Sequence, residues 1–524
     1  MPVALTSWDV EMQFSGVAGA WTSVVADVLL GAAPLRFKYG IAGGGPMDRV
    51  ADTGTCTFAL NNAASNSASL LGYYSPWHAN VRSGFTWGIG VRIKFVYGGV
   101  TYYKWRGKIA SIRPSPGSYR DRVTEIAAID WMDEIAQYKV QDVSLQISKR
   151  SDEVFSAVLA AMPKQPPATS IGTGLDTYLY SLDDLGDHPT AAIVAQKIAQ
   201  SELGFIYLKG DSTQGGTLVY ENRQSRILAG SVNLTTLSNT MITMDAPVSL
   251  ETLYNRVETT VHPKRIDAAA TSVLYSQPTG NAPLVAAGQS ITIWGDFRDP
   301  SQNAVSLIGG TSGVAPVATT DYLANSAADG SGSNLTANVS VTATYFAATA
   351  KFVITNSGGT DAYITFLQCR GKGIYDYGPQ RSRSEDTTSQ ANEGLRPLEI
   401  DMPYQDSLLN GQGAADYLLN IYSDPLTQVQ RVAFFASDTS ALLTAALARE
   451  ISHRIGLVET VTGISTASQR GFYIQSVEFE VQPSRVGPLV TCSWGLAPAS
   501  GSAVWILDQV GASELDDTTV LGYL

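Results

Sequence analysis

The sequence predicts a mainly β protein with α+β parts, built from two related β-barrels, a small α/β domain and an inserted β-sandwich. Three observations lead to this class. The chain has 524 residues, and roughly 150 residues per domain implies about three or four domains. Short runs that alternate apolar and polar residues recur through most of the chain, which is typical of half-buried strands. Amphipathic helical patterns are confined to two stretches.

Residues 1–147 are expected to form the first barrel. In two alternating runs the apolar members share one face of the expected strand: Cys56, Phe58 and Leu60 in residues 53–60, and Val91, Ile93 and Phe95 in residues 90–97. Two more strands are expected around the Pro/Gly turn within residues 107–130.

Residues 148–248 are expected to form the α/β domain. One helix should begin with Ser151 as its N-cap and end at Pro163. A second should carry Pro189 in its first turn and end at Gly204. Two strands around a Gly-rich turn follow in residues 205–226.

The second barrel, with helices, is assigned to residues 249–265 and 376–499. Residues 376–396 are polar and expected to be a loop, and helices are expected at 412–422 and 439–449. Between the two parts, residues 266–375 have few charges and short, regularly spaced β runs, which favours an inserted β-sandwich. Residues 500–524 are interpreted as a C-terminal arm that docks.

One internal echo links the two barrels. Residues 81–130 contain a polar segment, a strand with an Arg-Ile pair, a turn and two further strands, and the same order recurs from residue 448 onwards. We interpret this as a weak internal repeat. The aromatic residues Trp77, His78 and Trp87 have no counterpart in the second copy, so any special role should be one that the two barrels do not share.

Composition excludes some classes of protein. The net charge of −12 argues against a protein that grips nucleic acid, although nucleic acid passing through a channel stays compatible with it. The three cysteines lie far apart and suggest no disulfide framework. The N-terminus lacks the features of a signal peptide, and no apolar run is long enough to cross a membrane, so we expect folding in a cytosol.

No motif indicates an enzyme, a metal site or a cofactor. The four histidines show no metal-ligand spacing. A Ser/His/Asp triad stays open, because it is recognised by geometry rather than by order. Two groups of acidic residues could supply the carboxylate pair of a glycosidase. The simpler interpretation of Asp183, Asp184 and Asp187 is a helix cap, and that of Glu514, Asp516 and Asp517 is a solvated tail.

The inserted sandwich is rich in Thr, Asn and Tyr, a composition that suits binding a glycan through stacked rings and hydroxyl groups. The candidate contacts are Trp294, Tyr322 and Tyr345. The favoured interpretation is plainer: a spacer or decoration domain whose aromatic residues belong to its core.

Several segments together resemble the tail hub proteins of bacteriophages. Three segments are similar to the first barrel of that family: VRSGFTWGIGVRIKF (81–95), WRGKIASIRPSPG (105–117) and TEIAAIDWMDEIA (124–136). Its α/β domain is similar to IAQSELGFIYLKGD (198–211) and GTLVYENRQSR (216–226), and the entry to its second barrel to LYNRVETTVHPKR (253–265) and DPLTQVQRVAFFA (424–436). The resemblance covers most of the chain. The sandwich at 266–375 departs from it and puts in doubt whether the protein is only structural.

The resemblance implies a homotrimer whose paired barrels form a ring of six. Such a ring docks on a sixfold tail tube or distal tail protein ring and presents threefold symmetry to a central fibre or other tip protein. It would also surround the tape-measure protein and DNA as passing cargo. Arg82, Arg92, Lys94 and Arg454 become candidates for subunit contacts.

The leading hypothesis is therefore a structural tail-tip hub without catalysis, located at the virion tail tip and assembled in the host cytoplasm. One alternative is a tip protein that binds a host receptor or surface glycan through the sandwich. A less favoured one is a tail-associated cell-wall hydrolase, for which no nucleophile or metal motif is visible.

Overall fold

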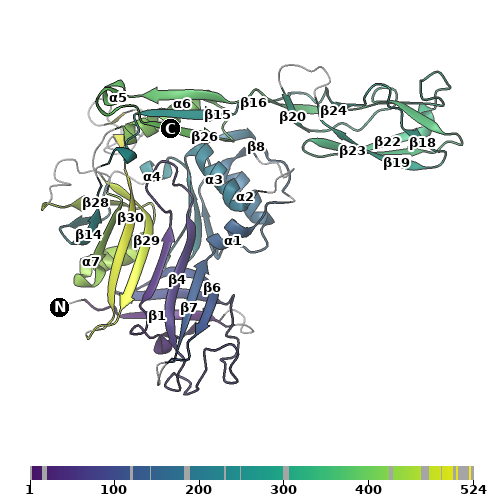
Figure 1. The fold of residues 1–524 in the computed structure, drawn as a ribbon. Helices are drawn as coiled ribbons and strands as arrows, with labels where there is room; N and C mark the ends of the chain where they lie inside the picture. Colours follow the sequence, from purple (N-terminus) through teal and green to yellow (C-terminus); the bar gives the residue numbers. More distant parts are fainter. Residues whose placement is uncertain are drawn as a thin grey trace.

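The structure, a computed structural model, describes residues 3–14, 20–117, 122–141, 143–181, 189–228, 232–247, 249–298, 306–423, 429–461, 471–485, 487–499, 503–504 and 519–520. Strands dominate, with a few helices between them, so the mainly β class with α+β parts is confirmed. Figure 1 shows a body of several layers from which one elongated lobe extends.

A sheet of 13 strands forms the centre of the body. Its order is β14-β27-β30-β29-β3-β4-β7-β6-β5-β1-β2, and β28 joins β29 and also pairs with β13. The bounds are β1 (Ser7–Gln13), β2 (Thr22–Ser23), β3 (Leu35–Gly40), β4 (Asp52–Asn61), β5 (Gly90–Tyr97), β6 (Val100–Pro114), β7 (Val123–Asp130), β13 (Thr236–Ser238), β14 (Met241–Asp245), β27 (Arg431–Phe435), β28 (Arg454–Val458), β29 (Phe472–Gln482) and β30 (Leu489–Pro498).

Strand β3 joins the two ends of the chain in this sheet. It pairs with β4 on one side and with β29 on the other, both antiparallel. Its alternate residues Leu35, Phe37 and Tyr39 are buried, as the period of two requires. The strands expected in two separate barrels therefore lie in one sheet, which stays open in the described part of the chain.

The sheet curls around its core. The rings of Phe37, Phe95 and Phe479 come from β3, β5 and β29, and their centroids lie 5.1 to 6.2 Å apart. Because β5 is not a neighbour of β3 in the sheet, these contacts require the sheet to bend over itself. The backbone N–H of Val3, before β1, donates to the carbonyl of Ser437, after β27 (2.7 Å). The curled sheet thus approaches a barrel without closing.

The internal echo corresponds to two similar strand arrangements. Strands β5, β6 and β7 form an antiparallel meander, and so do β28, β29 and β30. The copies differ at the first step, because β28 pairs with β29 at only two positions, Arg454↔Tyr473 and Ile455↔Phe472. Beyond them β3 takes the same edge of β29, from Ser476 onwards. This exchange explains why the second meander does not form a barrel of its own.

A small α/β unit packs on the main sheet and shares its hydrophobic core. Its elements are α1 (Met132–Gln137), β8 (Ile147–Arg150), α2 (Ser151–Ala161), β9 (Ala168–Ile171), β10 (Thr177–Tyr180), α3 (Ala191–Glu202), β11 (Phe205–Lys209), β12 (Thr217–Glu221) and α4 (Ser225–Leu228). Strand β12 lies between β11, antiparallel, and β9, parallel.

The starts of α2 and α3 differ from expectation. Ser151 is the first helical residue of α2 and Arg150 is the N-cap. The Ser151 hydroxyl instead donates a hydrogen bond to the carboxylate of Glu202 in the core. In α3 the N-cap is Thr190, whose Oγ1 accepts from the Ile193 N–H, so Pro189 precedes the helix.

A third layer covers the other end of the body, at the top of Figure 1. It consists of a three-stranded sheet in the order β25-β15-β26, with α6 packed on it around a separate cluster of buried residues. Its elements are β15 (Arg256–Val261), β25 (Gln380–Glu385), α5 (Thr387–Glu393), β26 (Pro397–Met402) and α6 (Leu408–Tyr422).

The prediction of a loop at 376–396 is wrong, because most of this segment forms β25 and α5. Strand β25 forms through backbone pairing with β15, which polar side chains do not prevent. Helix α5 follows because Asp386 caps it, with its carboxylate accepting the N–H groups of Thr388 and Ser389.

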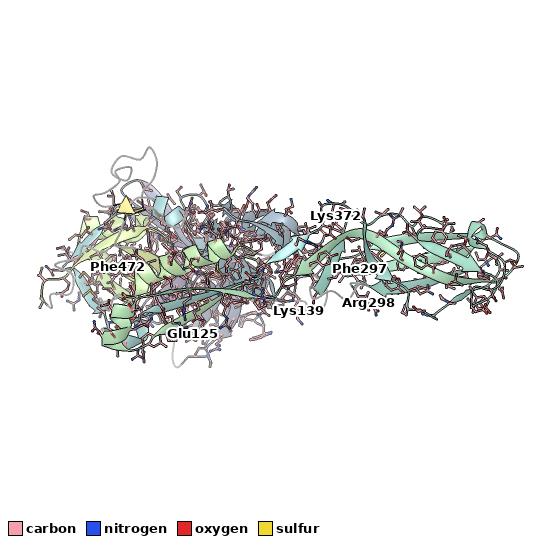
Figure 2. The ribbon with its side chains drawn as sticks, turned by 90° about the horizontal axis from the view of Figure 1, so that it is seen from above. Glu125, Lys139, Phe297, Arg298, Lys372 and Phe472 are labelled. Atoms are coloured by element: carbon pink, nitrogen blue, oxygen red, sulfur yellow. The ribbon has the colours of Figure 1, made fainter. Side chains whose placement is uncertain are left out.

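The lobe is made of two facing sheets with their own core. Figure 2 shows it extending from the body, with Phe297, Arg298 and Lys372 labelled on it. Its strands are β16 (Lys264–Ile266), β17 (Ser272–Ser276), β18 (Leu284–Val285), β19 (Ser290–Asp296), β20 (Ser306–Thr311), β21 (Tyr322–Asn325), β22 (Val339–Tyr345), β23 (Thr349–Asn356) and β24 (Ala362–Asp376). The entering and leaving strands pair with each other, with Lys264 opposite Asp376.

The remaining elements are short. They are η1 (Val25–Asp27), η2 (Leu250–Thr252), η3 (Thr336–Asn338), η4 (Ala436–Asp438), α7 (Ser440–Ala448), β31 (Ala503–Val504) and β32 (Thr519–Val520). Apart from β31 and β32, the arm expected at 500–524 lies outside the described residues. None of the described helices has the length and apolar character needed to span a membrane.

We predict that Asp130, at the end of β7, makes the protein less stable as pH rises from about 4 to about 7. Burial raises the pKa of Asp130 to about 7, whereas an aspartate in an unfolded chain titrates near 4. The unfolded chain therefore loses this proton first, and the free energy of unfolding falls by roughly 1.4 kcal/mol for each pKa unit of difference.

Urea denaturation across this pH range measures the effect. Asp130→Asn should flatten the dependence between about pH 5 and pH 7. Asp133→Asn, nearby and paired with Lys108, is the control. Asp133 contributes only the smallest of the effects on the pKa of Asp130, so this variant should keep most of the slope. An unchanged slope in Asp130→Asn would contradict the prediction.

Candidate functional site

The three described histidines each contact a neighbouring group of the chain, and none belongs to a metal-type cluster among the described residues. His78 Nδ1 accepts the Asn80 N–H (3.1 Å), and His262 Nε2 lies 2.6 Å from an Asp401 oxygen. His453 accepts from the Glu450 N–H, while His188 lies outside the described residues. Within the part of the chain that the structure describes, no three His, Cys, Asp or Glu side chains gather as a metal site would require.

The two acidic groups considered as a glycosidase pair, at 183–187 and 514–517, also lie outside the described residues. The cysteines are buried and unpaired: Cys56, Cys369 and Cys492. Burial raises the pKa of each thiol, to about 12 for Cys369, so none is activated as a nucleophile.

Arg92 and Lys94, two candidate subunit contacts, lie on the outer face of β5. Both bind the carboxylate of Glu11 on β1, and Lys94 Nζ is also 3.5 Å from Asp9. Burial opposes ionisation of Glu11, but the hydrogen bonds from Lys94 and Arg92 outweigh it and hold its pKa low. The Arg92 guanidinium also lies 4.4 Å from the ring centre of Trp21. These contacts stabilise the sheet edge, and a contact between subunits stays a prediction.

The other two candidates are also held within the chain. The Arg82 guanidinium lies 4.0 Å from the ring centre of Phe14 and donates to the hydroxyl of Tyr74 (3.1 Å). Arg454, at the start of β28, donates to the side-chain oxygen of Asn233 (3.2 Å). The four cations therefore come from the connection before β5, from β5 itself and from β28.

Trp77 and Trp87 are the most exposed aromatic side chains among the described residues, at 85% and 77%. They belong to the long connection between β4 and β5, which is firmly anchored. Within it Tyr74 is fully buried and its hydroxyl donates to Asp27 (2.6 Å), which also accepts the Ser67 N–H. Two large indoles thus stand in solvent on a well-packed support, an arrangement typical of contacts with another protein.

The three aromatic residues considered as glycan contacts have different surroundings. Trp294 is 58% exposed. Tyr322 is only 7% exposed, and its hydroxyl donates to the Val339 carbonyl inside the lobe. Tyr345 points inward, its hydroxyl donates to the Val314 carbonyl, and Gly313 covers its ring. Only Trp294 can present its ring to a ligand.

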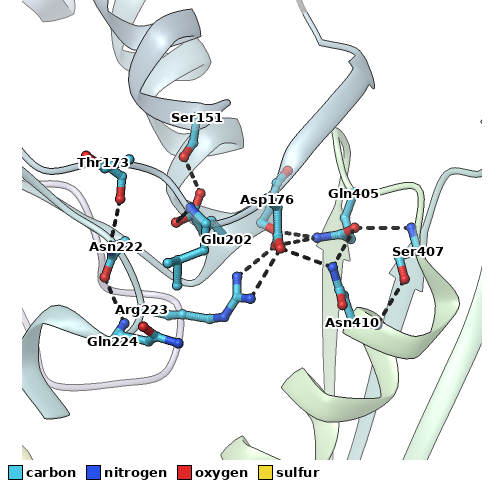
Figure 3. Close-up of polar contacts among 12 residues, drawn as sticks. Ser151, Thr173, Asp176, Glu202, Asn222, Arg223, Gln224, Gln405, Ser407 and Asn410 are labelled. Atoms are coloured by element: carbon cyan, nitrogen blue, oxygen red, sulfur yellow. Dashed lines mark hydrogen bonds and ion pairs between the residues drawn. The ribbon is translucent and has the colours of Figure 1, made fainter. Parts of the chain in front are cut away.

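A buried polar joint that the sequence did not reveal connects the α/β unit to the third layer (Figure 3). Both oxygens of Asp176 accept from the Arg223 guanidinium (2.7 and 3.2 Å). The amides of Gln405 and Asn410, from the third layer, donate to the same carboxylate (2.8 and 3.1 Å). Four donors therefore satisfy one buried carboxylate and hold the two units together.

The same region contains a buried acid in the α/β unit. Glu202, at the end of α3, accepts from the hydroxyl of Ser151 and from the N–H of Leu175 (2.9 Å). Tyr220 donates to Ser151 (2.6 Å) and completes the chain. Burial raises the pKa of Glu202 despite these bonds. The group is enclosed by packed helices and strands, so it acts as a structural connection.

A second joint connects the main sheet to the segment after α7. Lys104 on β6 is buried, and its ammonium binds the Glu450 carboxylate. It also donates to the carbonyls of Leu447, in the last turn of α7, and Arg449, just after it (3.2 and 3.0 Å). The hydroxyl of Tyr39 on β3 donates to Glu450 as well (2.9 Å). Burial, with Glu450 beside it, raises the pKa of Tyr39. One ion pair thus connects β3, β6 and the last third of the chain.

A third joint is formed by Arg226 in α4. Its guanidinium lies 3.4 Å from the ring centre of Phe205 and donates to Ser452 (3.0 Å) and Gln475 (2.8 Å). Burial lowers the pKa of this arginine. Of these joints only that of Lys104 carries a local sequence signal, a charge between two aromatic residues, Tyr103 and Trp105.

Two adjoining hollows of about 370 and 250 Å³ lie beside the loop after β3 and share Gly43 and Gln430. The larger is lined by both signs of charge, including Lys38, Arg431 and Glu478. Arg431 and Glu478 bind each other across it. The lining carries two cations, Lys38 and Arg431, and three acids, Asp52, Asp245 and Glu478. Neither sign dominates strongly, which does not favour a highly charged ligand.

We predict that Arg223→Met lowers the free energy of unfolding by about 3 kcal/mol or more, because it leaves the Asp176 carboxylate buried without its main partner. Arg36→Met is the matched control. Its ion pair with Glu480 has the same charges, but the arginine side chain is 57% exposed, against 6% for Arg223. The control should cost less than about 1 kcal/mol. Urea denaturation monitored by circular dichroism compares them, and equal losses would contradict the prediction.

Comparison with known proteins gives structural similarity only. No family model matches this chain, and no curated protein matches its sequence. Similar solved structures include the 43 kDa tail protein of prophage MuSo2 from Shewanella oneidensis, with 9% identity, a TM-score of 0.44, and coverage of 93% of this chain and 96% of that one. A tail protein from Neisseria meningitidis MC58 has 11% identity, a TM-score of 0.46, and coverage of 94% and 96%.

A third similar structure is the Francisella PdpA-VgrG complex, half-lidded, with 8% identity and a TM-score of 0.39. The match covers 95% of this chain and 59% of that one. Two of these three structures are described as tail proteins.

Proposed function

We propose that this protein is a structural virion protein, a trimeric hub at the tip of a phage tail. It joins a sixfold tail tube to a threefold distal tip or fibre and lines the channel through which DNA passes. The observation that carries this proposal is the shared sheet: strands from both ends of the chain form one continuous structure through the pairing of β3 with β29. No enzymatic activity is part of the proposal.

The buried joints suit a protein whose units must stay fixed relative to one another when neighbouring proteins pull on it. Lys104, Asp176 and Arg226 each connect elements far apart in the sequence, and each makes several hydrogen bonds inside the body. Separating any of these contacts would expose a charge with an incomplete set of partners, which is costly. A hub between two assemblies needs this resistance to relative movement of its parts.

The two meanders support the symmetry that we propose. Strands β5–β6–β7 and β28–β29–β30 follow the same antiparallel order. Two similar surfaces in each subunit would give six around a threefold axis, which matches a sixfold tube. The net charge of −12 suits a channel that lets DNA pass without holding it.

The exposed indoles of Trp77 and Trp87 suit contact with a neighbouring tail protein. They occur only in the first meander's approach, so they distinguish one half of the subunit from the other. Tryptophan is enriched where proteins bind each other. We assign this loop to a neighbour that the second half of the subunit does not meet.

The subunit count of the assembled particle tests the proposal. Electron microscopy of the purified protein, or of the tail that contains it, should show three copies or a multiple of three. A ring with any other count would contradict the hub. Release of sugar or peptide from host cell wall by the purified protein would contradict the absence of catalysis.

We predict that the double variant Trp77→Ser/Trp87→Ser keeps its stability but fails to join the tail. Both side chains are mostly in solvent, so the free energy of unfolding should change by less than about 0.5 kcal/mol. Counting complete tails by electron microscopy after complementation should show loss of the tip. Val100→Ser, another exposed apolar position, is the control and should assemble normally. Normal tails from the double variant would contradict the role assigned to this loop.

A further inference from the structure

The outer face of one lobe sheet is rich in hydroxyl groups. The sheet has the order β19-β23-β22. Its inner residues, such as Phe352, Ile354 and Val341, belong to the lobe core. Its outer residues alternate with them: Ser290, Thr292, Trp294 and Asp296 on β19, Thr349, Lys351, Val353 and Thr355 on β23, and Ser340, Thr342 and Thr344 on β22.

The register places these side chains in rows across the sheet. Ser290, Thr355 and Ser340 form one row, and the first two share a hydrogen bond between their hydroxyl oxygens (2.7 Å). Thr292, Val353 and Thr342 form the next, followed by Trp294, Lys351 and Thr344. Hydroxyl groups therefore lie at regular intervals beside one indole.

An aromatic pair closes this face at one end. The rings of Trp294 and Phe346 stack with centroids 5.5 Å apart and planes inclined by 29°. Phe346 is 41% exposed, so both rings contribute to the surface. Lys351 Nζ lies over the indole, 5.9 Å from the ring centre, which places an ammonium donor next to the aromatic pair. The turn that carries Phe346 is held by a hydrogen bond from its N–H to the Thr349 carbonyl (2.8 Å).

The charge of the outer face of this sheet favours some classes of ligand over others. Lys351 and Asp296 are its only charged members among the outer residues named above, and their charges cancel. Nucleic acid would need a basic surface. A protein interface has its aromatic anchors at the centre of the patch inside a polar rim, whereas here the two rings lie at one end of the hydroxyl rows. A neutral sugar chain needs what is present: an aromatic plane for the apolar face of a pyranose ring, and short polar groups beside it for its hydroxyls.

We propose that this face binds neutral carbohydrate, with the Trp294 indole, supported by Phe346 stacked against it, packing on a pyranose ring. Lys351 and the threonine and serine hydroxyls of the sheet hydrogen-bond to the adjoining sugars. Tyr322 and Tyr345 take no part, because both are held inside the lobe. The site is separate from the loop that carries Trp77 and Trp87 and does not depend on the hub function.

Binding of the full chain to immobilised oligosaccharides tests this site. The probes are neutral hexamers of glucose, mannose and N-acetylglucosamine, with a hexamer of galacturonic acid as the acidic comparison. At least one neutral hexamer should bind. Trp294→Ala should weaken that binding by about tenfold or more, and Phe346→Ala by a smaller factor, since loss of a stacking contact has this size. Trp87→Ala, an exposed tryptophan in the body, is the matched control and should stay within about twofold of the parent chain.

Three results would overturn the proposal. The first is that no neutral hexamer binds the full chain. The second is that only the acidic hexamer binds, which would indicate attraction by charge. The third is that Trp294→Ala binds as tightly as the parent chain while its circular dichroism is unchanged. A Thr342→Val variant adds a direct check of the hydroxyl rows, because it keeps the shape of the sheet and should weaken binding without abolishing it.

Discussion

The pairing of β3 with β29 is the interaction on which the rest of the structure depends. It brings Arg36 beside Glu480 on the outer face, 444 positions apart in the sequence, and Phe37 against Phe479 on the inner face. The body cannot be divided between these strands without opening its main sheet and its main core. Contacts between such distant residues close large loops, so the core cannot be completed until the last strands are available.

The sequence could predict most strands but not how they pair. Alternation identified the buried faces of β4 and β5 correctly, since a period of two reports which side is apolar. It carries no information about which strand lies beside which, so two barrels were expected where β3 enters the second meander. Polar composition misled at 380–393 for a related reason: backbone pairing and one capping aspartate decide the structure there.

The candidate site residues likewise depended on spatial information that the sequence does not contain. Composition pointed to Trp294, Tyr322 and Tyr345 equally, because a sequence without register does not say which side of a strand faces water. The structure separates one exposed indole from two enclosed phenols. The buried joints escaped notice because Asp176, Arg223 and Gln405 come from three distant segments, and only folding brings them into contact.

The paired ends of the lobe have a consequence for how such a chain changes over generations. Lys264 faces Asp376, and one step further into the body Val261 faces Gln380. Everything between these points leaves and re-enters the body through two adjacent strands, so its removal would leave an ordinary hairpin of β15 and β25. The body therefore places little constraint on what is inserted there. The lobe can therefore be exchanged as a unit, and a protein with an unchanged body can acquire a new surface in one event.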